Sequence, residues 1–445
     1  MDKESLKKTV CAHIEQNRER IVGLGECIMD EPELGFKENK TAARVGAFFG
    51  EIGLEYRNGL ALTGVKAVLT GAKPGPTVAL MGELDALVLP DHPRADSATG
   101  AAHACGHNAQ IAGLLGAALG LVGTAAQREL AGNVVFFAIP AEEYVEIDYR
   151  MQLVRAGKTT FLGGKPELIQ LGLFDDIDMA MMIHTSSAEL AQGSVGVGAS
   201  SNGFVAKTIR FIGKAAHAGV APEKGVNALQ AANLALVAIN CLRDTFRDQD
   251  SVRVHPIITK GGDLVNIVPA EATIETYVRG RTTAAVMDAA MKVDRAVKGA
   301  AVALGCSVEI QTVPGYMPMC NDRNLTRLFR ENSEQLMGSG EFREYPHGSG
   351  STDAGDLSQI MPVLHPYMSG AAGNAHSTAW HITNHDSGYV TPAKALAMMA
   401  IDLLHGDAEG ARQVQDEFTP SMTKAEYLDG QKQVFQRVVF DGTQV

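Results

Sequence analysis

The stretch "GPTVALMGELDAL", residues 75–87, runs from an apolar, β-branched segment into the acidic residues Glu83 and Asp85. This pattern is typical of a buried strand that ends in polar side chains. Two later stretches have the same form, and they are "GNVVFFAIPAEE" (132–143) and "DIDMAMMIHT" (176–185). The first of these ends at Glu142 and Glu143, and the second contains His184.

Helical patterns separate these strands, over residues 38–53, 109–126 and 148–157. Strands that alternate with helices predict an α/β domain with a mostly parallel central sheet. In such sheets, ligands bind beyond the carboxyl ends of the strands. We therefore expect the polar residues at these strand ends to gather at one rim, and they are Asp85, Glu142, Glu143 and His184.

The pattern changes near residue 200, where strands of a half-exposed sheet begin. The order over 200–312 is strand, helix, two strands, helix and strand, which is the ferredoxin-like α+β order. The sequence therefore predicts a catalytic domain over 1–199 and 313–445, interrupted by an inserted domain over 200–312. The chain after residue 380 is expected to end in helices.

Composition restricts the class of protein. The 445 residues carry a net charge of −12, which opposes binding to a phosphate backbone, so we expect no nucleic-acid partner. The six cysteines are scattered, and the start of the chain has no secretory apolar region, so we expect a cytoplasmic protein with free thiols. The apolar run at 111–126 is short for a bilayer span and predicts a buried helix.

The segment "AAHACGHNAQ", residues 101–110, places Cys105 two positions from His103 and from His107. In an extended segment, residues two apart point to the same face, so Cys105 and His107 can hold one metal ion. The neighbouring carboxylates Glu142 and Glu143 can divide two tasks, with one binding a metal and the other accepting a proton from water.

Six motifs in order make the chain resemble the two-metal aminoacylase/carboxypeptidase family of amidohydrolases, and they are "HACGHN", "PAEE", the His of "MMIHT", "GKAAHAG", "NIVPA" and the His of "GNAHSTAW". The stretches "GELDAL" and "GSTDAGDLS" look most like the second of the two subunits of p-aminobenzoyl-glutamate hydrolase and like related dipeptidases. The resemblance implies a di-metal catalytic domain whose inserted domain serves as a lid and a dimerisation surface.

The resemblance also implies roles for single residues. Glu142 matches the general base, and His217 matches a histidine that polarises the scissile carbonyl, often from the other copy in a dimer. The matched ligands of two divalent ions, zinc or manganese, are Cys105, His107, Glu143, His184 and His376. The matched substrate-binding positions are Asn266, Arg279, Gly348, Ser349 and Gly350. His381 and His385 are alternatives to His376 as the last ligand.

Three departures from the family pattern bear on the site. Asn108 stands where many relatives have Asp, and Glu83 replaces a shorter residue. The segment "YVEIDYRMQLV", 144–154, replaces a glycine-rich continuation, and we expect it to line the pocket.

We expect a metal-dependent amidohydrolase that cleaves an N-acyl or N-aroyl amino acid, such as p-aminobenzoyl-glutamate, or a dipeptide. The resemblance implies a homodimer, allows a second, different subunit, and gives no reason to expect a membrane. Two alternatives are a metal-bound scaffold or binding subunit without turnover, and an aminopeptidase that acts on longer peptides.

Overall fold

The computed structural model describes residues 1–187 and 195–444, which form two compact units. Unit 1 comprises Met1–Ala199, Cys320–Pro346 and Asp356–Met422, and unit 2 comprises Ser200–Met319, His347–Gly355 and Thr423–Val445. One boundary between the two units falls between Ala199 and Ser200. The sequence pattern assigns residues 347–355 and 423–445 to the catalytic domain, but their contacts group them with unit 2.

The central sheet of unit 1 has the strand order β1-β2-β6-β3-β7-β18 within the described residues. The pairs β6–β3, β3–β7 and β7–β18 are parallel, whereas β1–β2 and β2–β6 are antiparallel, so the sheet is mostly parallel as predicted. The strands are β1 (Tyr56–Leu60), β2 (Gly64–Thr70), β3 (Lys73–Glu83), β6 (Ala131–Ile139), β7 (Met179–Met181) and β18 (Val363–Leu364).

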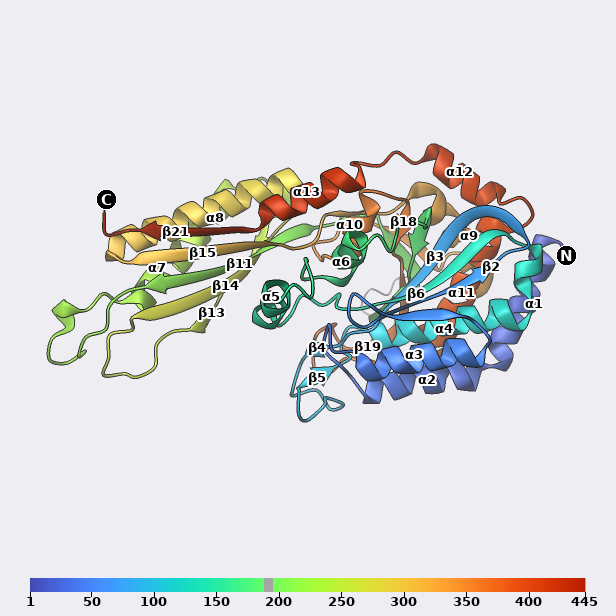
Figure 1. Ribbon diagram of the computed structural model, residues 1–445, viewed down its shortest axis with the longest axis horizontal. Helices are drawn as coiled ribbons and strands as arrows, with labels where there is room; N and C mark the ends of the chain where they lie inside the picture. Colours follow the sequence, from blue (N-terminus) through green and yellow to red (C-terminus); the bar gives the residue numbers. More distant parts are fainter. Residues whose placement is uncertain (188–194, 445) are drawn as a thin grey trace. The chain divides into compact units, whose positions relative to one another are not determined.

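Three helices of unit 1 make most of the helix contacts with this sheet, and they are α3, α4 and α11 (Figure 1). The central one is α4 (His107–Gly123), which packs against β3, and it is buried on all sides because α1, α2 and α11 cover it. The other helices are α1 (Lys3–Gln16), α2 (Arg18–Asp30), α3 (Asn39–Glu51), α5 (Ile147–Arg155), α6 (Gly164–Gln170), α9 (Arg323–Met337), α10 (Ala354–Ser358), α11 (Thr391–Leu404) and α12 (Glu409–Glu417).

A second sheet of unit 1 has the order β17-β9-β19-β20, and β8 also pairs with β19. Its strands are β8 (His184–Ser187), β9 (Val195–Gly198), β17 (Phe342–Tyr345), β19 (Tyr367–Ala372) and β20 (His381–Ile382). The short strands β4 (Leu87–Val88) and β5 (Ala101–Ala102) pair with each other between β3 and α4 in the chain. This small hairpin leads directly into the Cys105 segment.

Unit 2 has an antiparallel sheet with the order β12-β14-β11-β15-β21, and β13 also pairs with β14. Helices α7 and α8 pack together and against this sheet, which confirms the ferredoxin-like order (Figure 1). Its elements are β11 (Gly203–Ile212), α7 (Ala228–Cys241), β12 (Arg253–Val254), β13 (Ile257–Lys260), β14 (Glu271–Gly280), α8 (Thr283–Leu304), β15 (Ser307–Pro314), α13 (Lys424–Val434) and β21 (Gln436–Asp441). Two further short strands are β10 (Ser200–Ser201) and β16 (Met319–Cys320).

The prediction that the chain ends in helices is wrong for its last strand, β21, which pairs antiparallel with β15. The β-branched run Val438–Val439 favours this conformation, but its mostly exposed side chains give no burial pattern to reveal it. None of the helices in the described residues is long and apolar enough to cross a membrane. The apolar run at 111–126 lies largely in the buried helix α4, as predicted.

Candidate metal centre

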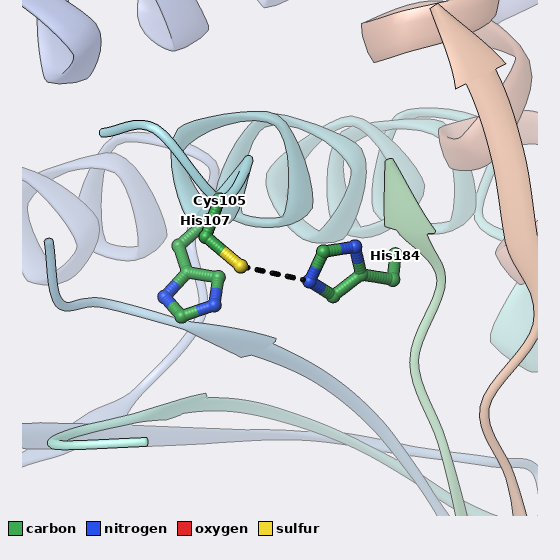
Figure 2. Close-up of side chains that lie close together, drawn as sticks. All are labelled: Cys105, His107 and His184. Carbon is green, nitrogen blue, oxygen red and sulfur yellow. Dashed lines mark hydrogen bonds between the residues drawn. The ribbon is translucent and has the colours of Figure 1, made fainter. Parts of the chain in front are cut away.

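A tight turn brings Cys105 and His107 together (Figure 2). The predicted extended segment is wrong here, because His107 is the first residue of α4 and Gly106 caps that helix. Gly106 has a φ of +108°, and a Cβ there would lie 3.1 Å from the Trp380 ring and 3.2 Å from Thr185. Glycine adopts this left-handed conformation without strain. The turn, rather than strand alternation, places the two side chains side by side.

The Cys105 sulfur lies at the centre of a group of ring nitrogens. Its Sγ is 3.4 Å from the Nε2 atoms of both His184 and His376. Burial raises the pKa of Cys105, whereas His184 and His107 lower it, and the net result is a pKa of about 6. A thiol with this pKa is largely a thiolate at neutral pH, which is the form that binds a metal.

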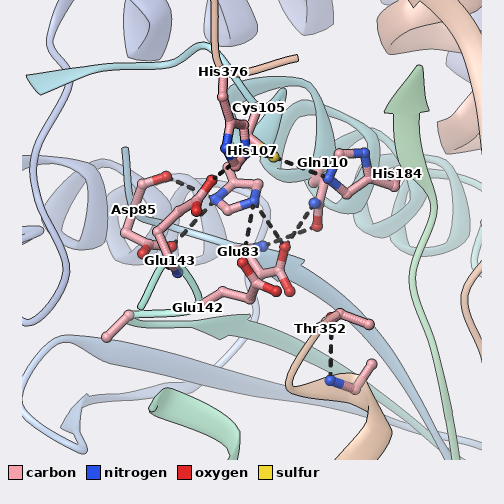
Figure 3. Close-up of polar contacts among 12 residues, drawn as sticks. Glu83, Asp85, Cys105, His107, Gln110, Glu142, Glu143, His184, Thr352 and His376 are labelled. Atoms are coloured by element: carbon pink, nitrogen blue, oxygen red, sulfur yellow. Dashed lines mark hydrogen bonds and ion pairs between the residues drawn. The ribbon is translucent and has the colours of Figure 1, made fainter. Parts of the chain in front are cut away.

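Asp85 orients two of the candidate ligands (Figure 3). His107 Nδ1 lies 2.8 Å from the Asp85 backbone carbonyl and 3.2 Å from its Oδ1, so this ring nitrogen donates and Nε2 points to the cluster. The Glu143 backbone N–H donates to Asp85 Oδ2 over 2.8 Å. A carboxylate that orients a ligating histidine in this way is common around protein metal sites.

Glu142 and Glu143 follow strand β6 after a strained residue. Ala141 has a φ of +54°, an unfavourable conformation for a residue with a Cβ. The guanidinium of Arg150, on α5, donates to the backbone carbonyls of Ala141, Glu143 and Leu162. The segment 144–154, expected to line a pocket, thus contributes a buried side chain that supports the loop of the two carboxylates.

Of the three histidines near residue 380, His376 is the one that approaches the cluster. Its Nε2 lies 3.3 Å from Glu143 Oε1 as well as 3.4 Å from Cys105 Sγ. Its φ of +62° is left-handed, which indicates local backbone strain at this position. His381 Nδ1 lies 2.8 Å from the Ala379 carbonyl, and His385 faces Glu26. The geometry therefore favours His376 over these two alternatives.

Within the described residues, three groups of side chains bring their ligand atoms within 4.8 Å of one another. They are Cys105, His107 and His184; Cys105, Glu143 and His376; and Glu83, His107 and Glu142. Their thiolate, imidazole and carboxylate atoms are the donor types that divalent metal ions bind in proteins.

The remaining predicted residues lie in unit 2, in two separate places. His217 and Asn266 are adjacent, because Ala218 N–H donates to the Asn266 carbonyl over 2.9 Å and His217 pairs with Ile267. This pair lies beyond the end of the β11–β14 ladder where Ile212 pairs with Glu271.

Arg279 lies at the other end of that ladder, opposite Phe204. Its Nη1 donates to Ser351 Oγ over 3.0 Å, and Gly348 N–H donates to the Ser200 carbonyl over 2.8 Å. The structure therefore brings Arg279 together with the Gly348–Gly350 loop, and it does not bring either of them to His217 and Asn266.

Sequence reasoning misses two buried residues beside Glu83. Lys165 Nζ lies 2.6 Å from Glu83 Oε1, and Gln110 Nε2 donates to Glu83 Oε2 over 2.8 Å. Gln110 is a polar residue near the start of the mostly apolar helix α4, and this signal is present in the sequence. Lys165 lies far from the other site residues in the chain, so no local pattern indicates it.

His365 has no role predicted from the sequence, and it lies beside the cluster. Its ring centroid is 5.7 Å from that of His184, and its buried Nε2 has no hydrogen-bond partner. Burial lowers the pKa of His365 to about 3, and it lowers that of His103 similarly. Both rings are therefore neutral at physiological pH. His103 is in none of the three ligand groups.

The candidate ligands and a further carboxylate lie together at the carboxyl ends of parallel strands. This arrangement is typical of a metal-dependent hydrolase that acts on amide or peptide bonds. The chain belongs to the peptidase family M20/M25/M40, whose profile matches residues 79–402. This confirms the resemblance read from the motifs.

Individual comparisons agree with this assignment. The chain is 29% identical over 448 aligned positions to the Xaa-Arg dipeptidase of Mus musculus, covering 92% of each protein. Its fold is similar to that of a dinuclear metal-binding peptidase from Bacillus subtilis, with a TM-score of 0.65, 22% identity, and 87% and 98% of the two chains covered. It is also similar to an aminobenzoyl-glutamate utilization protein from Klebsiella pneumoniae, with a TM-score of 0.67, 20% identity, and 88% and 98% covered.

Proposed function

We propose that the enzyme hydrolyses the amide bond of an N-acyl or N-aroyl amino acid, or of a dipeptide, at a centre of two divalent ions. The observation that carries this proposal is the set of three ligand groups, of which two share Cys105 and the third contains Glu142. The family relatives support the substrate class, since they include an Xaa-Arg dipeptidase and an N-acyl-L-amino acid amidohydrolase.

The proposed ligands are Cys105, His107, Glu143, His184 and His376. A thiolate combined with imidazoles favours zinc, and the carboxylate-rich part of the cluster also suits manganese. His184 Nδ1 lies 2.7 Å from the Thr185 carbonyl and donates to it, so Nε2 is the ring atom directed at Cys105. The bound ions would lower the pKa of a water molecule and polarise the amide carbonyl.

Glu142 is the proposed general base. Its Oε2 lies 3.9 Å from His107 Nε2, so its carboxylate lies beside the proposed ligands. It would accept a proton from the attacking water and pass that proton to the leaving amine. His217 is the proposed donor that stabilises negative charge on the scissile carbonyl oxygen.

Arg279 is the proposed anchor for the substrate carboxylate, together with the Gly348–Gly350 loop, and Asn266 is the proposed substrate-binding residue beside His217. A guanidinium binds a carboxylate with two parallel hydrogen bonds, which would orient the amide for attack. Support comes from the contact of Arg279 with Ser351, next to that loop.

We propose that the enzyme acts as a homodimer through unit 2. Arg279 lies near one end of the β11–β14 ladder, opposite Phe204, and His217 lies beyond the other end, where Ile212 pairs with Glu271. The eight residue steps from Arg279 to Glu271 span about 27 Å along an antiparallel strand. A dipeptide is only about 7 Å long, so one small substrate can contact both residues only if they come from different copies.

The cytoplasm is the proposed location, because the six cysteines of the chain are free thiols and the reducing cytoplasm keeps thiols in that form. The competing function is a metal-bound scaffold without turnover. Glu142, in a ligand group with His107, favours the enzyme over the scaffold.

The test is a hydrolysis screen of the purified protein before chelation, after chelation, and after reloading with Zn²⁺ or Mn²⁺. The panel holds N-acetyl and N-benzoyl amino acids, p-aminobenzoyl-glutamate, and dipeptides with neutral and basic C-terminal residues, each as the free acid and as the C-terminal amide. We expect hydrolysis that chelation abolishes and one metal restores, with a strong preference for free acids. Metal-loaded protein without turnover on any member would support the scaffold, and equal rates on acids and amides would contradict the carboxylate anchor.

A further inference from the structure

Glu83 is a buried carboxylate held on both oxygens beside a candidate metal ligand. It ends strand β3 and is 1% exposed. Lys165 Nζ lies 2.6 Å from Oε1, and Gln110 Nε2 donates to Oε2 over 2.8 Å. A carboxylate oxygen can accept a second interaction, and His107 Nε2 lies 3.1 Å from Oε2.

His107 presents its Nε2 atom to two carboxylates. His107 Nδ1 donates to Asp85, so Nε2 is the ring atom left to bind an ion. Glu83 Oε2 lies 3.1 Å from this nitrogen, and Glu142 Oε2 lies 3.9 Å from it.

We propose that Glu83 is a further metal ligand, on the ion bound by His107 Nε2. The inference rests on the proposed metal centre and extends its set of ligands. Metal–nitrogen and metal–oxygen bonds of about 2.0–2.2 Å place two ligand atoms of one ion roughly 3–3.5 Å apart. The separation of 3.1 Å between Glu83 Oε2 and His107 Nε2 fits this range. Glu83, His107 and Glu142 already form one of the three convergent ligand groups.

Lys165 positions Glu83 for this role. Its side chain is 0% exposed, and a buried ammonium requires a nearby anion. Helix α6 brings it to the strand end through Gly164, where a Cβ would lie 1.7 Å from the Pro140 carbonyl oxygen. The Lys165 charge holds Oε1 and leaves Oε2 directed at His107. Lys165 also compensates the Glu83 charge when no ion is bound.

The first test compares Glu83→Gln with Glu167→Gln as a matched control. Glu167 lies on α6, is 3% exposed, and accepts hydrogen bonds from the Thr160 and Phe161 amides, outside the three ligand groups. Zn²⁺ affinity is measured by competition with a chelator, and the ligand set by visible absorption of the Co²⁺-loaded protein. Loss of a partner that only orients a ligand weakens binding by about 10–100-fold, so loss of a ligand should exceed this for one of the two ions.

We expect Glu83→Gln to lower the affinity for one of the two Zn²⁺ ions by more than about 100-fold and to change the absorption spectrum of the Co²⁺-loaded protein. Glu167→Gln should change neither the affinity nor the spectrum. An unchanged Co²⁺ spectrum would overturn the inference even if affinity falls, because it leaves Glu83 a positioning role only. Wild-type protein that binds no metal would instead refute the proposed metal centre, so the two failures are distinguishable.

The second test uses Lys165→Met and the melting temperature. If Glu83 binds an ion, the metal-free variant leaves its buried charge uncompensated, and metal binding restores the compensation. We therefore expect a larger rise in melting temperature on Zn²⁺ addition than in the wild type. An unchanged rise would overturn the inference, since it indicates an ion pair that the metal does not touch. The double variant Glu83→Gln/Lys165→Met removes both charges, and it should fold with weak binding of one ion even if Glu83→Gln alone does not fold.

Discussion

Cys105 belongs to two of the three ligand groups, as His107 does. Cys105→Ala should therefore lower the affinity for both metal ions, whereas loss of a ligand from one group should affect mainly one. Metal content per chain after dialysis, measured by elemental analysis, checks this. Cys306→Ala is the matched control, since Cys306 is buried in unit 2 and lies in none of the groups. If Cys105→Ala binds as much metal as Cys306→Ala, Cys105 is not a metal ligand.

The protonation of His376 predicts how metal affinity depends on pH. Hydrogen bonds with Cys105 and Glu143 raise the pKa of His376 to about 11 in the metal-free protein, so its ring is protonated at pH 7. A metal binds the neutral ring, so binding must release this proton, and affinity should rise with pH. Calorimetric titration with Zn²⁺ at pH 7, in two buffers of different ionisation enthalpy, should show net proton release. Binding heats that are the same in both buffers would contradict the predicted proton release.

At the scale of elements, the start of helix α4 sets the geometry of the ligands. Gly106→Ala introduces a Cβ at a φ of +108°, next to Trp380 and Thr185. The strained conformation should cost about 1–3 kcal/mol of unfolding free energy and move Cys105 relative to His107. Denaturant unfolding and Zn²⁺ affinity are the measurements, and Gly299→Ala on α8 is the control because nothing lies within 4 Å of its Cβ position. Equal stability and affinity in both variants would show that the turn does not position the ligands.

The order of elements can be read from the sequence, because hydrophobic periodicity reports which side chains are buried. Strand β3 and helix α4 form where their patterns predict them, and the carboxylates after β3 and β6 meet as expected. The turn at Gly106 cannot be predicted in this way, since the helix begins at His107, where strand alternation predicts an extended segment. Nor can strand β21, because an exposed edge strand carries little pattern.

Contacts between distant segments are the part that sequence reasoning cannot supply. Lys165 pairs with Glu83 across 82 positions of the chain, and only the packing of α6 beside β6 brings them together. The support of Arg150 for the Glu143 loop likewise depends on where α5 packs. Such pairs follow from tertiary structure, which local periodicity does not encode.

At the scale of the whole molecule, the proposed homodimer predicts complementation between inactive chains. Glu142→Gln and His217→Ala should each inactivate the protein alone. If His217 acts on the partner's centre, a heterodimer of the two variants contains one centre with both residues intact. Mixing the chains should then restore hydrolysis. The control mixes each variant with itself, and native mass spectrometry confirms subunit exchange. Confirmed exchange without recovered activity would place His217 in its own chain's site or outside the reaction.

The most direct test of the central claim, that the metal cluster and Glu142 together carry out amide hydrolysis, is to measure turnover and metal content of Glu142→Gln side by side. The substitution removes the proposed base and leaves all five proposed metal ligands in place. We predict metal content equal to that of the wild type and a turnover lower by about 10²–10⁴-fold, as expected when general-base catalysis is lost. A variant that keeps its metal and more than about a tenth of the wild-type turnover would contradict the account.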